Sequence, residues 1–162
     1  MSRSTYSPEE IERIVYFQPL IDEKATKYNV SPTLVSGLAH TLSQYQSEYE
    51  SPFGGLGLFQ MTKGMWSSLS QKNGVSADPL DPNSQVEFAY FLLDDLQKRN
   101  KQSPHAYDAT VAMFVSGYEP IRDLISKHGE SWIDYMPEET KKTVEAVNLS
   151  QLDFEDVYAG VI

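Results

Sequence analysis

Three times in this chain a capping side chain is followed directly by proline and then by apolar residues at steps of three and four: Ser7-Pro8, Ser31-Pro32 and Asp81-Pro82. Serine and aspartate accept hydrogen bonds from the free N–H groups at a helix start, and proline suits the first helical position because it has no N–H to leave unpaired. Apolar residues at this spacing lie on one side of a helix. The pattern predicts helices over about residues 8–28, 32–45 and 82–99.

Further helix signals occupy most of the remaining chain. Thr62 can cap a short helix, and three more helices are expected over about residues 106–115, 119–127 and 137–147. Pro19 lies inside the first expected helix and should divide it near Gln18, because proline removes a backbone donor. No pair of strands with a hairpin signal occurs. The sequence therefore predicts a mostly α fold of about seven helices.

The size of the chain favours a single core. It has 162 residues, of which 40% are hydrophobic, and one domain of this length buries enough surface to fold without disulfides or metals. We expect one domain over residues 1–148 and a C-terminal tail over residues 149–162. The tail either docks on the domain or binds a partner.

Charge and residue usage exclude several classes of function. The formal net charge is −10, which repels phosphate backbones, so nucleic acid is not an expected partner. No apolar run is long enough to span a bilayer. There is no cysteine, and His40, His105 and His128 are far apart in sequence without a metal-binding spacing. The sequence predicts neither a metal site nor a cofactor.

Five short segments carry a family resemblance. They are residues 28–35 (YNVSPTLV), 54–61 (GGLGLFQM), 81–83 (DPN), 112–117 (AMFVSG) and 137–140 (PEET). Their content and order resemble the soluble lytic transglycosylases and goose-type lysozymes, which cleave the glycan strands of bacterial peptidoglycan. The resemblance implies a lysozyme-like fold, with the glycine-containing loop at residues 54–61 lining a sugar cleft.

The resemblance also implies a catalytic glutamate, followed by serine, near the end of the helix that begins at Pro32. When Pro32 and Gly54 are aligned with the family without a gap, this pair falls on Leu42-Ser43, and Tyr45 falls on the usual aromatic. In the family the glutamate protonates the glycosidic oxygen and then accepts the proton of the muramyl 6-hydroxyl. A leucine can do neither. The chain thus resembles a degenerate member of the family that has lost its acid.

Two other polar groups of the expected cleft are also missing. Phe114 keeps the ring of the family's tyrosine without its hydroxyl, and Val115 replaces an asparagine. A cleft that still binds glycan would stack aromatic rings on the sugars and orient them with a few polar groups. The candidate binding residues are Ser43, Tyr45, Ser51, Gln60, Phe114 and Tyr118.

Three alternatives stay open at the level of single residues. Leu42 continues the stripe of Leu34 and Leu38, so it could be an ordinary core residue. Glu48 or Glu50 could supply the missing acid, provided that the loop before the glycines were shorter and the helix longer; otherwise both are solvated. The glycine loop could also persist only because the fold needs its turns.

These observations lead to three hypotheses about function. The first is a catalytically inactive transglycosylase-like domain that binds peptidoglycan glycan or forms part of a cell-wall-penetrating assembly such as a phage particle. The second is an active peptidoglycan lyase or hydrolase that uses Glu48 or Glu50. The third is a structural domain that holds a protein partner through its acidic surface or its C-terminal tail. No signal peptide is visible, so we expect a virion-associated or cytoplasmic location.

Overall fold

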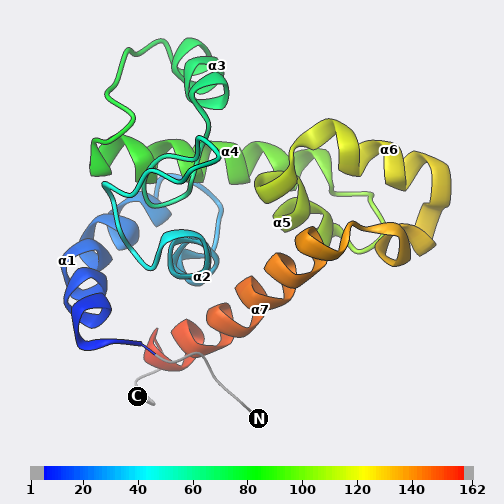
Figure 1. Ribbon diagram of the computed structural model, residues 1–162. Coiled ribbons are helices and arrows are strands. Elements are labelled where there is room, and N and C mark those ends of the chain that lie inside the picture. Colours follow the sequence, from blue (N-terminus) through cyan, green and yellow to red (C-terminus); the bar gives the residue numbers. More distant parts are fainter. Residues whose placement is uncertain (1–5, 159–162) are drawn as a thin grey trace.

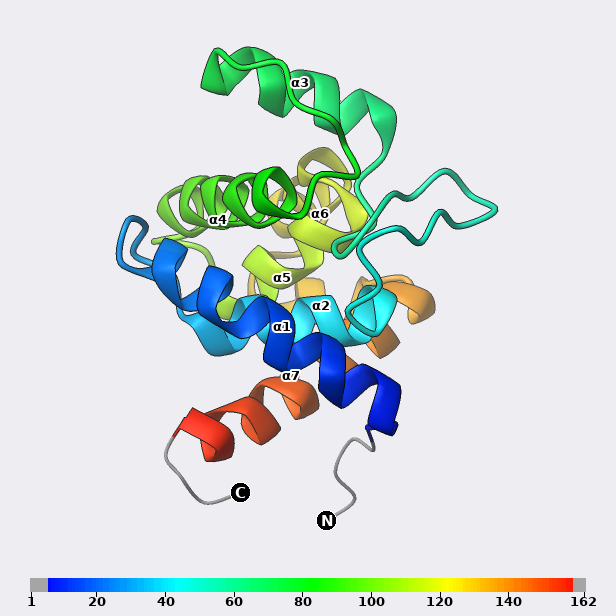
Figure 2. The same ribbon diagram turned by 90° about the vertical axis from the view of Figure 1, so that its left-hand side faces the viewer.

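The computed structural model describes residues 6–158, and within this range it confirms the mostly α fold (Figures 1 and 2). Seven α-helices and one 3-10 helix occur there, with two isolated β-bridges and no strand. None of the described helices has the combination of length and apolar character that a membrane span requires. The elements are α1 (Pro8–Ala25), α2 (Pro32–Ser43), α3 (Lys63–Asn73), α4 (Pro82–Arg99), α5 (Ala106–Ser116), α6 (Tyr118–His128), η1 (Gly129–Tyr135) and α7 (Glu138–Tyr158).

Four helices begin at the capping residues that the sequence identified. In each, the capping side chain accepts a hydrogen bond from a backbone N–H of the first turn, at 3.1–3.3 Å. Each cap satisfies one of the donors that a helix start leaves free. These capping residues are Ser7 for α1, Ser31 for α2, Thr62 for α3 and Asp81 for α4.

Pro19 does not divide the first helix, so the predicted break near Gln18 is wrong. α1 is a single element with Pro19 inside it. The hydrogen bond that proline cannot donate would end on the carbonyl of Val15, four residues earlier. Val15 is 68% exposed, so water can satisfy this carbonyl.

α7 is longer than expected, because it continues to Tyr158 through the segment that was predicted to be a tail. It packs along α2, where a Cβ on Gly37 would lie only 3.1 Å from the carbonyl oxygen of Val147. Gln151 donates a hydrogen bond to Thr33 Oγ1 at 3.0 Å across this contact. The polar residues at positions 150 and 151 interrupt the apolar pattern by which the sequence would indicate a continuing helix. Phe154, beyond them, is nevertheless buried. Residues 159–162 of the expected tail lie outside the described residues.

α2 is the buried axis of the domain. Its residues from Thr33 to Ala39 are all buried, and α1 and α7 pack against it (Figure 2). α4 joins this core through Tyr90, whose hydroxyl donates to the carbonyl of Ile21 on α1 at 2.8 Å. The end of α2 is therefore a rigid position from which the following loop leaves the core.

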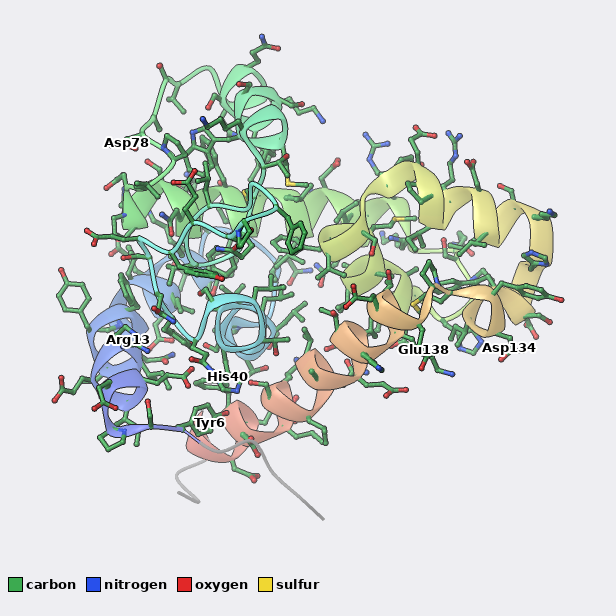
Figure 3. The ribbon with its side chains drawn as sticks, viewed as in Figure 1. Tyr6, Arg13, His40, Asp78, Asp134 and Glu138 are labelled. Atoms are coloured by element: carbon green, nitrogen blue, oxygen red, sulfur yellow. The ribbon has the colours of Figure 1, made fainter. Side chains whose placement is uncertain are left out.

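A cluster of polar side chains joins the N-terminal end of α1 to α2 and α7 (Figure 3). Glu10 is 2% exposed and lies 2.5 Å from His40 Nδ1. The ring of Tyr6 packs on His40 with 4.5 Å between ring centroids, and its hydroxyl donates to Asp153. Burial raises the pKa of Tyr6 to about 12. These contacts tie three helices together at the end of the domain opposite α3 and α6.

Gln85 of α4 is a buried side chain that contacts the segment between α2 and α3 from outside the segment. Its Oε1 accepts from the N–H of Leu58 at 2.9 Å, and its Nε2 donates to the carbonyls of Ser47 and Pro79 at 3.0 and 2.9 Å. Gly57 lies against this amide, with φ of +73°, and a Cβ there would be 2.4 Å from Gln85 Nε2. Only glycine fits this position without strain.

We expect Gly57→Val to lower the melting temperature by at least about 5 °C, because the side chain would both strain the backbone and displace the Gln85 amide. Gly64→Val on α3 is the matched control, since nothing lies within 4 Å of a Cβ at Gly64. Thermal unfolding followed by circular dichroism measures both. Equal melting temperatures for the two variants would contradict this account of the loop.

Gln85→Met should cost about 3 kcal/mol or more of unfolding free energy, because three backbone groups lose their partner while staying at least partly buried. Gln97→Met provides a control, since Gln97 makes a single exposed hydrogen bond to the carbonyl of Asn29. Urea unfolding measures both costs. A loss below about 1 kcal/mol at Gln85 would show that the loop does not depend on this residue.

Candidate functional site

A pocket of about 280 Å³ opens where the end of α2, the loop before α3 and the end of α5 meet. α2 contributes Leu42, and the turn after α5 contributes Gly117. None of the residues that line it is titratable, and most are apolar. The lining residues are Leu42, Phe59, Gln60, Thr62, Met65, Phe114, Val115, Ser116 and Gly117.

Two buried aromatic rings support the wall of this pocket. Phe59 and Phe114 meet edge to face, with centroids 6.3 Å apart and an interplanar angle of 83°, which is a favourable geometry for aromatic pairs. Because Phe59 precedes α3 and Phe114 lies in α5, this contact joins the loop to the second half of the domain.

Polar groups occur at the rim of the pocket, on Gln60, Thr62 and Ser116. Gln60 has a φ of +53°, and its Nε2 donates to the carbonyls of Tyr49 and Gly57 at 3.1 and 2.8 Å. Ser116 shares a hydrogen bond of 2.7 Å with Thr140 at the start of α7. These contacts fix the positions of the two side chains.

Leu42 lies on the pocket wall and is half-buried. It lines the pocket and also packs against the core. Its environment therefore matches in part that of a core residue and in part that of a residue facing a cleft. Among the residues that the structure describes, no carboxylate lines the pocket beside it.

Ser43 and Tyr45 were predicted to face a ligand, and the structure corrects this. Ser43 is buried and its Oγ lies 3.1 Å from the carbonyl of Ala39 and 2.8 Å from that of Leu58. Tyr45 is fully buried, near the rings of Phe17 and Phe154. Gln44 and Tyr45 both have positive φ, of 52° and 61°, and this turn sends the chain inward immediately after α2. Both side chains support the fold.

Ser51 and Tyr118 also lie outside the pocket lining, although Gln60 and Phe114 are part of it. Ser51 Oγ accepts from the N–H of Gly55 at 3.0 Å and so shapes the loop. The Tyr118 ring lies near two guanidinium groups, those of Arg99 at 5.0 Å and Arg122 at 5.7 Å.

The two candidate replacement acids do not reach the Leu42 pocket. Glu48 lines a different pocket, together with Arg13. Glu50 is exposed, and its backbone forms a bridge with Leu56. The structure therefore brings no glutamate of this loop to the position that the family resemblance assigns to the acid.

The sequence analysis missed several residues that build the site. Phe59, Met65 and Ser116 line the pocket, and Gln85 holds the loop. Phe59 and Ser116 lie inside the segments that resemble the family. Their position next to the matched residues could have indicated that they line the pocket. Nothing local to Gln85 indicates its role, because its partners are 6 to 38 residues away.

Several solved structures have a fold similar to that of this chain. An inactive mutant of lytic transglycosylase Slt from Pseudomonas aeruginosa superposes with a TM-score of 0.75 at 15% identity, over 89% of this chain and 24% of that one. The 70 kDa soluble lytic transglycosylase of Escherichia coli gives 0.76 at 16% identity, over 89% of this chain and 24% of that one. A complex of the 70 kDa soluble lytic transglycosylase with bulgecin A gives 0.78 at 14% identity, over 90% and 25%.

These similarities confirm the lysozyme-like, mostly α fold. The chain spans only about a quarter of the length of the proteins that it matches. No curated protein matches it in sequence. The profile of the transglycosylase SLT domain, however, matches residues 19–137, which is well over half of the chain. These residues include α2, the loop and α5, which together form the pocket, and the chain therefore belongs to the transglycosylase SLT domain family.

Proposed function

We propose that this protein is a catalytically inactive SLT domain that binds the glycan strands of peptidoglycan. The observation that carries the proposal is the position of Leu42, which lines the pocket at the end of α2 in the place that the family resemblance assigns to the acid. Cleavage of a glycosidic bond needs a group that protonates the leaving oxygen. No lining residue can donate that proton at neutral pH.

The composition of the pocket supports binding without cleavage. N-acetylated sugars combine apolar ring faces and methyl groups with hydroxyls and amides, and their sites combine apolar walls with a few fixed polar groups. Here Phe59, Phe114 and Met65 provide apolar wall, and Thr62 and Ser116 provide hydroxyls at its edge. A pocket of about 280 Å³ has room for about one sugar residue and not for a whole oligosaccharide. Longer glycans would extend across the surface beside it.

Participation in a larger cell-wall-penetrating assembly, such as a phage particle, is part of this proposal. It is supported by the family membership together with the missing acid, since a domain that binds wall glycan without cutting it can still position neighbouring machinery. An active enzyme that uses Glu48 or Glu50 is less well supported, because neither side chain lines the pocket of Leu42.

Purified protein should release no 1,6-anhydromuropeptides from peptidoglycan above a buffer control, because it lacks the acid. Leu42→Glu restores a carboxylate to the pocket wall, and Leu42→Gln is its uncharged control. Since Leu42 is half-buried beside an apolar wall, the new carboxyl should have a raised pKa. Product analysis by liquid chromatography measures release. Activity in the parent protein would overturn the proposal, whereas weak activity confined to Leu42→Glu would strengthen it.

Chitotetraose should bind weakly, with a dissociation constant in the millimolar to high-micromolar range, which corresponds to about −4 to −7 kcal/mol. We expect chemical-shift changes at the amides around Leu42, Gln60 and Ser116. Met65→Trp should weaken binding at least about tenfold by filling the pocket, whereas Ser67→Trp on the exposed side of α3 should not. Absence of shift changes at millimolar ligand would exclude glycan binding here.

A further inference from the structure

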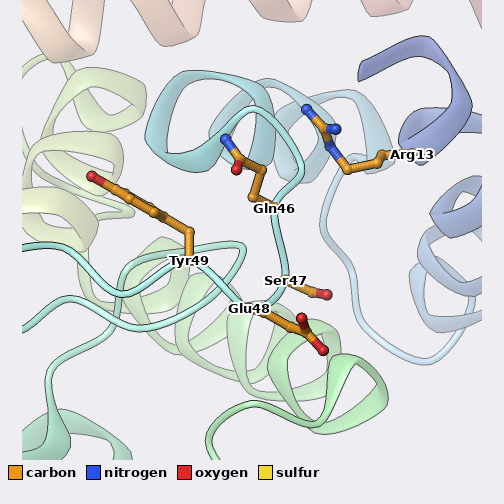
Figure 4. A pocket seen from close by; sticks show the side chains of 5 residues that line it. All are labelled: Arg13, Gln46, Ser47, Glu48 and Tyr49. Atoms are coloured by element: carbon orange, nitrogen blue, oxygen red, sulfur yellow. The ribbon is translucent and has the colours of Figure 1, made fainter. Parts of the chain in front are cut away.

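A second pocket, of about 340 Å³, is formed by α1 and the loop that follows α2, and its lining differs in chemistry from that of the Leu42 pocket. Arg13 of α1 lies on one side, and the loop supplies four consecutive residues on the other. Figure 4 shows the Glu48 carboxylate and the Ser47 hydroxyl directed to the same side of the loop, whereas the Tyr49 ring points the other way. The lining residues are Arg13, Gln46, Ser47, Glu48 and Tyr49.

Arg13 is held in place by a contact that leaves most of its donors available. Its Nε donates to the carbonyl of Gln44 at 3.1 Å. Gln44 is the first residue of the left-handed turn at the end of α2. Among the described residues no carboxylate lies within ion-pair distance of Arg13. The fork of the guanidinium is therefore free to bind a carboxylate from outside the protein.

Glu48 provides the opposite charge in the same pocket. Its side chain is exposed, and within the described part of the chain it forms neither an ion pair with Arg13 nor one with another cation. Two opposite charges that line one small pocket without touching each other match a ligand that carries both charges close together. An amino acid with a free ammonium and a free carboxylate on one carbon has this arrangement, and Ser47 can donate or accept a further hydrogen bond.

The position of this pocket relates it to the proposed glycan site. Tyr49 lines the second pocket, and its carbonyl accepts a hydrogen bond from Gln60, which lines the first. The two pockets thus lie on the same loop. Peptidoglycan combines glycan with short peptides, and in peptides that contain meso-diaminopimelate the side-chain end of this residue carries an ammonium and a carboxylate on one carbon.

We infer that the pocket of Arg13 and Glu48 binds the zwitterionic side-chain end of a peptidoglycan stem peptide. Arg13 binds the carboxylate through its free N–H groups, and Glu48 binds the ammonium. The identity of this ligand rests on the proposed function, because it takes peptidoglycan as the target. The site itself rests only on two opposite charges that line one pocket and have no ion-pair partner among the described residues (Figure 4).

The test uses the peptide L-Ala-γ-D-Glu-meso-diaminopimelate without any sugar, titrated into the whole chain and followed by backbone chemical shifts. The peptide should shift the amides of residues 46–49. Two modified peptides, with the side-chain ammonium acetylated or the side-chain carboxylate amidated, should each bind at least tenfold more weakly. Equal binding of all three peptides would overturn the proposal, and so would shifts located away from these residues.

Protein variants give a second measurement. Glu48→Gln and Arg13→Gln should each weaken binding of the unmodified peptide at least tenfold, whereas Arg122→Gln and Glu145→Gln, at exposed positions elsewhere, should not. Because Arg13 also contacts Gln44, Arg13→Gln could destabilise the fold. Glu48 makes no such contact with any residue that the structure describes, so unchanged binding by Glu48→Gln alone would overturn the proposal.

Two further ligands separate the sources of failure. Free alanine carries the same two charges, and if it bound as tightly as the peptide, the site would be one for free amino acids and the assignment to stem peptide would be wrong. Chitotetraose tests the Leu42 pocket independently. Binding of chitotetraose without binding of the peptide would reject this inference and leave the proposed function intact.

Discussion

The site depends on one buried amide, that of Gln85. This side chain satisfies a donor and two acceptors from three separate stretches of backbone, at Leu58, Ser47 and Pro79. Backbone groups of an irregular segment have no ladder or helix to satisfy them, so a buried loop needs such partners. Gly57 permits the close approach because it has no Cβ. With the loop held in this way, Phe59 reaches Phe114 and the pocket closes between them.

The second constraint is the burial of α2, which places its last turn at the edge of the core. A residue at position 42 must both pack against the core and face the pocket, and leucine does both. A carboxylate there would lose hydration on its buried side and would need compensating polar groups. The neighbouring Phe114 and Val115 offer none. The apolar side chains at positions 42, 114 and 115 therefore form one continuous apolar part of the pocket wall.

The loop after α2 divides two environments that suit different ligand chemistry. On one side the pocket of Leu42 is uncharged, whereas on the other Arg13 and Glu48 present opposite charges. The hydrogen bond from Gln60 to the Tyr49 carbonyl connects the two sides. A glycan strand that carries charged peptides as side branches presents both kinds of chemistry.

Local signals were enough to place the helix starts, because a cap involves residues only two or three positions apart, as at Ser7, Ser31 and Asp81. The family could also be predicted from the sequence, since motif order and spacing are properties of the chain alone. The conformation of the chain directly after α2 could not be predicted from the sequence. Ser43, the last residue of α2, and Tyr45, in the left-handed turn after it, are both buried, although the family alignment had assigned them to a ligand. The role of Gln85 and the full length of α7 likewise depend on contacts between residues far apart in sequence, and only the tertiary structure decides which distant segments meet.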